Sequence, residues 1–241
     1  MYQLHRSFIR PESKVVLLLN ENPFLILLLE HMEADFTVGE KSVSELCAEY
    51  RIDLPSFLVI ANLYNGFNPG EAEIDAISDI STIIRYLKNS HKYYKYSKYP
   101  EIKELISQLH DQDNSSDIIL TEKFFNEYFL EVQEHLTYED EIVFPFMCRL
   151  MTGEKSREDE SFSVKEYREH HTDIETKLAD LKNLLLKHLT IRGKVETRRK
   201  ILFSLFKLEA DLLLHSRVEE MVLLPLAEKL EKSRRHGQKK G

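Results

Sequence analysis

Apolar residues recur at steps of three or four along four long stretches of the chain. Residues that share such a step lie on one face of an α-helix. We therefore predict four long helices, each with one buried face. The predicted faces are Ile80, Ile84, Leu87, His91 and Tyr94; Tyr128, Val132, His135, Glu139 and Ile142; Tyr167, His171, Ile174, Leu178, Leu181 and Leu185; and Ile201, Leu205, Leu208, Leu212, His215, Glu219 and Val222.

Polar and turn-forming residues separate these stretches. Asp79 or Ser78 is suited to cap the first helix and Ser163 the third, and Pro100 predicts a kink or a restart in the first. The predicted connections are residues 111–116, 152–162 and 190–196. Four helices joined in this way favour an all-α fold, an antiparallel four-helix bundle over residues 76–231.

Two further parts flank the predicted bundle. Residues 1–75 are expected to form a small N-terminal helical domain, which ends in the turn-forming run Asn-Gly-Phe-Asn-Pro-Gly at 65–70. Residues 232–241 form a basic tail, which we expect to be flexible and solvated.

Composition and charge narrow the classes of protein. The chain has 241 residues, 42% of them apolar, and a net charge of −8, which disfavours nucleic-acid binding because duplex affinity depends on neutralising phosphates. The two cysteines, Cys47 and Cys148, exclude a disulfide framework and a CxxC zinc site. No apolar run approaches the roughly 20 residues of a membrane span. We therefore expect a cytoplasmic protein with no membrane or nucleic-acid partner; the oligomeric state stays open.

Each predicted buried face carries a histidine, and two carry a glutamate one turn later. These pairs are His135-x-x-x-Glu139 and His215-x-x-x-Glu219. One such histidine is usually a core residue, and one such pair is usually a surface pair. Four imidazoles and two carboxylates in one core are different, because a buried carboxylate without a partner costs several kcal/mol. The shared phase of the four faces therefore favours a bound metal.

An internal repeat supports this interpretation. Its members lie 80 positions apart and pair as His91 with His171, His135 with His215, Glu139 with Glu219, and Pro145 with Pro225. The repeat predicts two related helical hairpins and a site for two similar metal ions. It also favours His171 over the adjacent His170, because neighbours on a helix point about 100° apart.

The ligand types restrict the metal. Imidazoles and carboxylates without a thiolate favour iron, manganese or zinc over copper(I). Structural zinc prefers four ligands, which six candidates exceed. If both glutamates bridge two ions and each ion takes two histidines, a shared oxo or hydroxo group leaves one position open on each ion.

These residues resemble the hemerythrin-like family of di-iron four-helix proteins, over about residues 78–230. The element His-x-x-x-Glu-x-x-x-x-x-Pro, present twice, carries the resemblance. Within the family the chain looks most like the repair of iron centres proteins, which are linked to nitrosative and oxidative damage of iron–sulfur clusters. The resemblance implies two non-haem iron ions, oxo- or hydroxo-bridged, whose ligands are His91, His135, Glu139, His171, His215 and Glu219.

The chain departs from the oxygen-carrying members of that family. Those proteins use a fifth histidine where this chain has Glu175, and they space the last histidine and acid as His-x-x-x-x-Asp. Both differences argue against a simple oxygen carrier. We interpret Glu175 as an exposed acid, with a role as extra ligand or acceptor as the alternative. Three tyrosines are expected near the ligand layers: Tyr94, Tyr128 and Tyr167.

The N-terminal region allows two interpretations. Residues 36–53 are similar to the small N-terminal domain of the repair proteins, but the adjacent cysteines of that domain are replaced here at 54–56. We interpret Cys47 as a small buried apolar residue. Residues 42–64 also resemble the start of a helix-turn-helix, yet the second helix offers one asparagine and no basic residue for base edges. We favour a core or partner helix there.

The resemblance implies iron-centre repair, or iron donation to apo iron–sulfur proteins, under nitrosative or oxidative stress. The alternatives are a binding or sensing protein for oxygen or nitric oxide with the N-terminal region as output module, an oxidoreductase that consumes peroxide or nitric oxide, and a metal-free scaffold. No Gly-rich phosphate loop or nucleophile motif is present. Whether the protein is an enzyme stays open.

Overall fold

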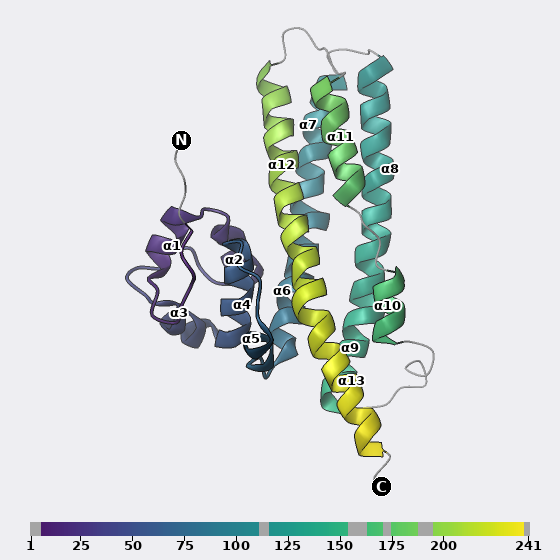
Figure 1. Ribbon diagram of the computed structural model, residues 1–241. Helices are drawn as coiled ribbons and strands as arrows, with labels where there is room; N and C mark the ends of the chain where they lie inside the picture. The colour runs from purple at the N-terminus through teal and green to yellow at the C-terminus, as the bar shows by residue number, and fades with distance from the viewer. Residues whose placement is uncertain (1–5, 111–115, 154–162, 171–174, 188–194, 239–241) are drawn as a thin grey trace. The chain divides into compact units, whose positions relative to one another are not determined.

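The regular structure of the described chain is helical, apart from one isolated bridge between Lys14 and Ser42 (Figure 1). The predicted all-α class is therefore confirmed. The computed structural model describes residues 6–110, 116–153, 163–170, 175–187 and 195–238. Its contacts divide the chain into two compact units, which are residues 1–90, 143–170 and 214–241, and residues 91–142 and 171–213.

The unit of residues 91–142 and 171–213 has a single apolar core. Its helices are α7 (Tyr99–His110), α8 (Ser116–Tyr138), α11 (Glu175–Lys187) and the part of α12 (Val195–Val218) up to residue 213. All four contribute buried side chains to one cluster, for example Ile106, Phe125, Leu181 and Leu208. Tyr99 donates a hydrogen bond to the hydroxyl of Tyr128 at 3.1 Å inside this cluster. Parts of the four predicted faces thus meet in this core: Tyr94 of the first, Tyr128 and Val132 of the second, Leu178, Leu181 and Leu185 of the third, and Ile201, Leu205, Leu208 and Leu212 of the fourth.

The helix boundaries follow local signals in the sequence. α6 (Ile80–Tyr93) begins after Asp79, whose side chain accepts a hydrogen bond from the backbone N–H of Ser81 at 2.9 Å. Pro100 does not end the helix. Instead, α6 passes into α7 through the π-helical segment η1 (Tyr94–Lys98), where the Tyr99 N–H donates to the carbonyl of Tyr94.

The other unit contains the N-terminal helices. These are α1 (Val15–Glu21), α2 (Leu25–His31), α3 (Val43–Tyr50), α4 (Leu54–Tyr64) and α5 (Glu71–Asp75). The unit also holds α6 up to Ser90, α9 (Phe144–Thr152), α10 (Val164–His170) and α13 (Leu224–Gln238). Buried Asn62 holds the extended N-terminal segment, because it accepts from the Ile9 N–H at 2.8 Å and donates to the Ile9 carbonyl at 3.0 Å. These bonds satisfy backbone groups that no helix pairs.

Helices α3 and α4 follow one another across a short turn, at the place where the sequence resembles the start of a helix-turn-helix. The turn passes through Arg51, which has a left-handed φ of 53°. Most of α4 is buried, including Phe57, Ile60 and Asn62. Its partly exposed positions are Leu54, Pro55 and Leu58. α4 therefore presents apolar rather than base-reading side chains, in line with its interpretation as a core helix.

The two thiols have contrasting surroundings, which predicts contrasting reactivity. Cys47 is buried, and burial, with the charge of Asp53, raises the pKa of its thiol to about 12. At pH 8 roughly one Cys47 in ten thousand is then a thiolate, the form that reacts. Cys148 is exposed. We expect a disulfide reagent to modify Cys148 in the folded protein and Cys47 only after unfolding. Thiol counting with and without denaturant tests this, and fast labelling of Cys47 in the Cys148→Ser variant would contradict it.

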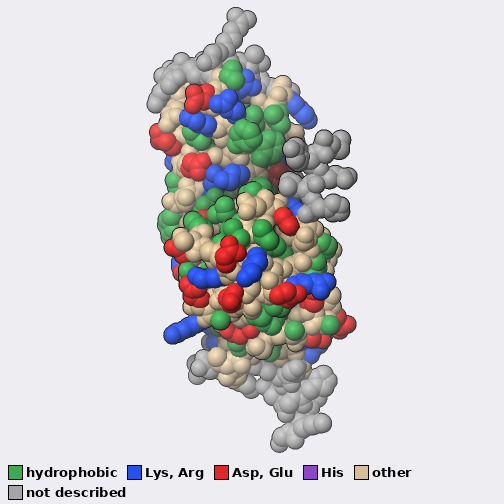
Figure 2. Space-filling view, turned by 90° about the vertical axis from the view of Figure 1, so that its left-hand side faces the viewer, with side chains coloured by type: hydrophobic (Ala, Val, Ile, Leu, Met, Phe, Trp, Pro, Cys, Tyr) green, Lys and Arg blue, Asp and Glu red, His purple; other side chains and the backbone are tan. Residues whose placement is uncertain are grey.

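The described surface includes an apolar patch on α12. Val195, Phe203 and Phe206 are exposed there and line, with Arg198 and Arg199, a cavity of about 330 Å³. Figure 2 shows one face of the molecule, on which acidic and basic side chains are interspersed with hydrophobic ones. Within the described ranges, no helix is long and apolar enough to cross a membrane.

Candidate metal centre

Both His-x-x-x-Glu pairs lie where a long α-helix changes into a π-helical segment. His135 is in the last turn of α8, and Glu139 opens η2 (Glu139–Val143). His215 is in the last turn of α12, and Glu219 opens η4 (Glu219–Leu223). In η4 the wider turn is evident because the Leu224 N–H donates to the carbonyl of Glu219, five residues earlier. Single π turns within helices occur frequently at functional sites.

A proline follows each of these π segments. Pro145 and Pro225 are the second residues of α9 and α13. Because proline has no N–H, the carbonyl four residues earlier loses its α-helical partner, and a wider turn accommodates that loss. The predicted helices were continuous, so these segments were missed. The proline six residues after each glutamate was the available signal.

The extra residue in η2 corrects one predicted core position. Ile142 was placed on the buried face but is 46% exposed, whereas the neighbouring Val143 is fully buried. A π turn adds one residue to the helix and rotates the residues that follow it, so the prediction of Ile142 as a core residue was wrong.

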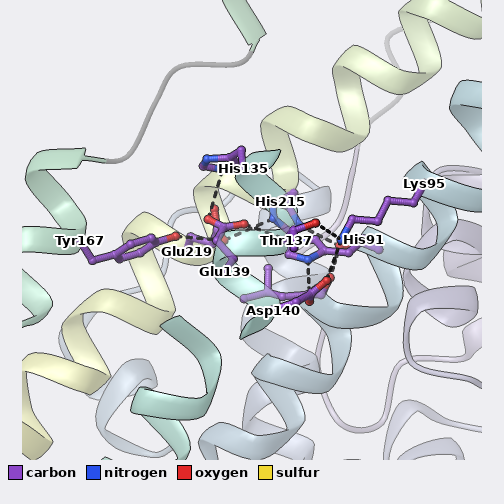
Figure 3. Close-up of polar contacts among 11 residues, drawn as sticks. His91, Lys95, His135, Thr137, Glu139, Asp140, Tyr167, His215 and Glu219 are labelled. Atoms are coloured by element: carbon purple, nitrogen blue, oxygen red, sulfur yellow. Dashed lines mark hydrogen bonds and ion pairs between the residues drawn. The ribbon is translucent and has the colours of Figure 1, made fainter. Parts of the chain in front are cut away.

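Glu139 is completely buried between two imidazoles (Figure 3). Its Oε2 lies 3.4 Å from Nε2 of His91, and its Oε1 lies 3.2 Å from Nε2 of His135. Burial alone would raise the pKa of this carboxyl group. Contacts with His135 and His91 outweigh burial and hold the pKa well below its usual value. Glu139 is therefore a buried carboxylate ion.

The far side of His91 has a charged partner. Its Nδ1 lies 2.9 Å from Oδ1 of Asp140, and Oδ2 of Asp140 accepts from Nζ of Lys95 at 2.9 Å. Burial would lower the pKa of His91, but Asp140 and Glu139 raise it to about 9. Partial burial likewise opposes the ionisation of Asp140, yet His91 and Lys95 lower its pKa. His91 thus lies between two carboxylates, one at each ring nitrogen.

The second pair has a different set of contacts. Nε2 of His215 lies 3.3 Å from Oε1 of Glu219, and the Tyr167 hydroxyl donates to the same oxygen at 3.3 Å. Nδ1 of His215 lies 2.8 Å from the hydroxyl of Ser90. Since that hydroxyl donates its hydrogen to the carbonyl of Leu87 at 2.7 Å, it accepts from Nδ1–H of His215.

This geometry fits a bound metal cation. When His91 and His215 are neutral with Nδ1 protonated, Nε2 of each ring presents a lone pair to a carboxylate oxygen, and a metal cation bound between the two acceptors would satisfy both. In the metal-free protein a proton on Nε2 of His91 takes that place, in line with the raised pKa of His91. The nitrogen–oxygen separations of 3.2–3.4 Å are close to the roughly 3 Å expected for two ligands at right angles on one ion with bonds of about 2.1 Å. Imidazole and carboxylate suit iron, manganese or zinc.

The structure brings four of the six predicted ligands together. His91, Glu139, His215 and Glu219 each offer one ligand atom, and these atoms lie within 4.8 Å of one another. His135 contacts Glu139 but is not in that group. Predicted ligand His171 lies outside the described residues, as do the side chains of His170 and Glu175.

Most of the side chains that hydrogen-bond to the proposed ligands were not predicted from the sequence. Of the three tyrosines expected near the site, Tyr167 donates a hydrogen bond to the carboxylate of Glu219. Tyr128 instead accepts a hydrogen bond from Tyr99 in the apolar core. Asp140, Lys95 and Ser90 were not predicted. Asp140 follows Glu139, and Lys95 lies one helical turn after His91, but these spacings also occur in ordinary surface pairs.

Comparisons with known proteins agree with this geometry. A comparison with curated proteins finds no match. The family model of the hemerythrin HHE cation-binding domain matches residues 82–227, which include all six predicted ligands. That match covers more than half of the chain. Together with the buried histidine–glutamate cluster, it establishes that the chain belongs to the hemerythrin HHE cation-binding domain family.

Proposed function

We propose that the protein is a non-haem di-iron protein that serves in the repair of iron–sulfur or other iron centres under nitrosative or oxidative stress. The proposed ligands are His91, His135, Glu139, His171, His215 and Glu219. Two iron ions bridged by an oxo or hydroxo group would supply electron transfer and affinity for small diatomic molecules. The observation that carries the proposal is a pair of buried glutamates, each facing Nε2 of a histidine whose Nδ1 has its own partner.

The proposed architecture is an antiparallel four-helix bundle over residues 76–231, with a helical domain at 1–75 and a basic tail at 232–241. The apolar core shared by α7, α8, α11 and α12 supports the bundle, and the consecutive helices α1–α5 support a helical N-terminal part. A cytoplasmic location is proposed because Cys47 and Cys148 are both free thiols.

Metal content tests the centre itself. Protein produced with ample iron should contain about two iron ions per chain and show the visible absorption of an oxo-bridged pair. His135→Ala and His171→Ala should lose iron and absorption, whereas the matched control His170→Ala should keep both. No metal in the wild type, or full metal in His171→Ala, would contradict the proposed ligands.

A second candidate function is sensing of oxygen or nitric oxide, with residues 1–75 as output module. The separately capped α3 and α4 favour a structured N-terminal module. Repair predicts transfer of iron to an apo iron–sulfur protein. Sensing predicts reversible, ligand-dependent spectra with altered protease sensitivity in residues 1–75. Steady turnover of peroxide or nitric oxide with a reductant would instead indicate an oxidoreductase.

A further inference from the structure

Helix α12 carries a second apolar stripe, beside the face that it buries. Its buried side chains, such as Leu208 and Leu212, belong to the core cluster. Other large apolar side chains of the helix are exposed, with fractions of 70% for Val195, 46% for Phe206 and 52% for Leu213. A helix that packs on one core normally has a polar outer surface, so an exposed apolar stripe indicates a contact surface.

This stripe has the spacing of a coiled-coil seam. Its six positions follow one another in steps of four and three residues, and at about 100° per residue all lie within roughly 40° of one line along the helix. Two helices pack in a coiled coil with this spacing, so the expected partner of the seam is another helix. The seam positions are Val195, Arg199, Leu202, Phe206, Glu209 and Leu213.

The order of residues along the seam is symmetric about Ser204. If a second copy of the helix runs in the opposite direction, positions at equal distances from residue 204 oppose one another. Apolar side chains then meet apolar ones, and the cation meets the anion: Val195 with Leu213, Leu202 with Phe206, and Arg199 with Glu209. A two-fold symmetric dimer requires a surface that is complementary to itself in this way.

The side chains that would form this contact are accessible. Arg199 is exposed, and the Glu209 side chain is 30% exposed although it pairs with Lys182. A carboxylate has about four acceptor sites, so this pair leaves Glu209 able to bind a second cation. Nζ of Lys182 lies 4.6 Å from the centre of the Phe206 ring, a cation–π contact that holds the ring at the seam.

The surface beside the seam is hollowed. The cavity of about 330 Å³ on α12 is lined by seam residues together with Phe203, which is 64% exposed. A hollow of this volume has room for a side chain of an opposing helix. The pattern, the charges and the shape of this surface therefore all fit a second helix.

We propose that α12 is the contact surface of a two-fold symmetric homodimer, in which the seams of two copies pack antiparallel about Ser204. A second copy of this chain fits the seam because the apolar and charged positions of the seam complement themselves. The seam extends about 27 Å along the helix. One pair of helices buries much less area than an obligate dimer does, so this dimer dissociates on dilution.

Analytical ultracentrifugation of the full-length protein over a wide range of concentrations tests the proposal. The wild type should change from monomer to dimer as its concentration rises. Arg199→Glu and Glu209→Arg should each weaken dimerisation about tenfold, because each variant places like charges opposite one another twice in the symmetric contact. The double variant Arg199→Glu, Glu209→Arg exchanges the charges and should restore much of the affinity.

The matched control is Lys200→Glu, which reverses an exposed charge on the same helix about 140° from the seam and should leave dimerisation unchanged. Thermal unfolding of each variant identifies any folding defect. A wild type that stays monomeric at every concentration, or a double variant no better than the two single ones, would overturn the inference. Iron content should be the same in all variants, because the seam contains no proposed ligand, so a failed dimer leaves the proposed function intact.

Discussion

Replacing Glu139 with alanine is expected to abolish tight metal binding and to lower the free energy of unfolding of the metal-free protein by about 3–5 kcal/mol. The carboxylate is completely buried and lies within 3.4 Å of both His91 and His135. Without it, the two imidazoles keep the penalty of burial and lose the anion that compensates them. Metal analysis and urea unfolding of the metal-free protein measure the two effects.

Two variants control this experiment. Glu141→Ala removes an exposed carboxylate two residues away and should change stability by less than about 0.5 kcal/mol. Replacing His91, His135 and Glu139 together with leucine should bind no metal at this pair, yet unfold close to the wild type or above it, because packed apolar residues often substitute for buried ion pairs without loss. A Glu139→Ala variant as stable as the wild type would show that Glu139 is not ionised in the folded protein.

Removing the metal is expected to produce the second large effect. A ligand that binds only the folded state adds about 4 kcal/mol of stability when its free concentration is roughly a thousandfold above its Kd. At about 2–4 °C per kcal/mol for a chain of this size, chelation should lower the unfolding temperature by roughly 8–16 °C. Calorimetry at fixed free metal concentrations measures this shift, and an unfolding temperature independent of metal would contradict it.

The stability of the metal-free protein is expected to depend on pH through the charges of His91 and Glu139. The pKa of His91 is raised to about 9 from an ordinary 6.5. Its contribution to stability is therefore complete below about pH 6.5 and is lost as the pH rises through 9. The lowered pKa of Glu139 acts in the opposite direction and loses its contribution in acid. Metal-free protein should thus be less stable at pH 10 than at pH 7.

Much of this arrangement could be predicted from the sequence. Leu208 and Leu212 share a helical face with His215 and Glu219, and that phase alone predicted buried ligands on one side of α12. The repeat of 80 residues predicted that the same chemistry occurs twice. These features can be read from the sequence because every turn of a half-buried helix places a residue on the buried face, so the pattern repeats many times.

The remainder depended on contacts that periodicity does not encode. Ile142 was placed on the buried face because it lies three residues after Glu139. The extra residue of the π turn leaves no obvious break in a pattern of steps of three and four. Asp140 and Ser90 act across the fold on histidines 49 and 125 residues away in the sequence, so no local spacing identifies them. The family match supports cation binding but does not specify which polar neighbours hold the ligands in place.

The π-helical segments that begin at Glu139 and Glu219 also have a consequence for the backbone itself. Their bonds reach five residues back instead of four, so each long helix contains a short stretch in which the regular ladder is interrupted. Amide protons there are expected to exchange with solvent sooner than those of the turns on either side, because a wider turn is easier to open locally. Hydrogen exchange measured residue by residue would then show each glutamate at the start of a brief, fast-exchanging stretch within an otherwise protected helix.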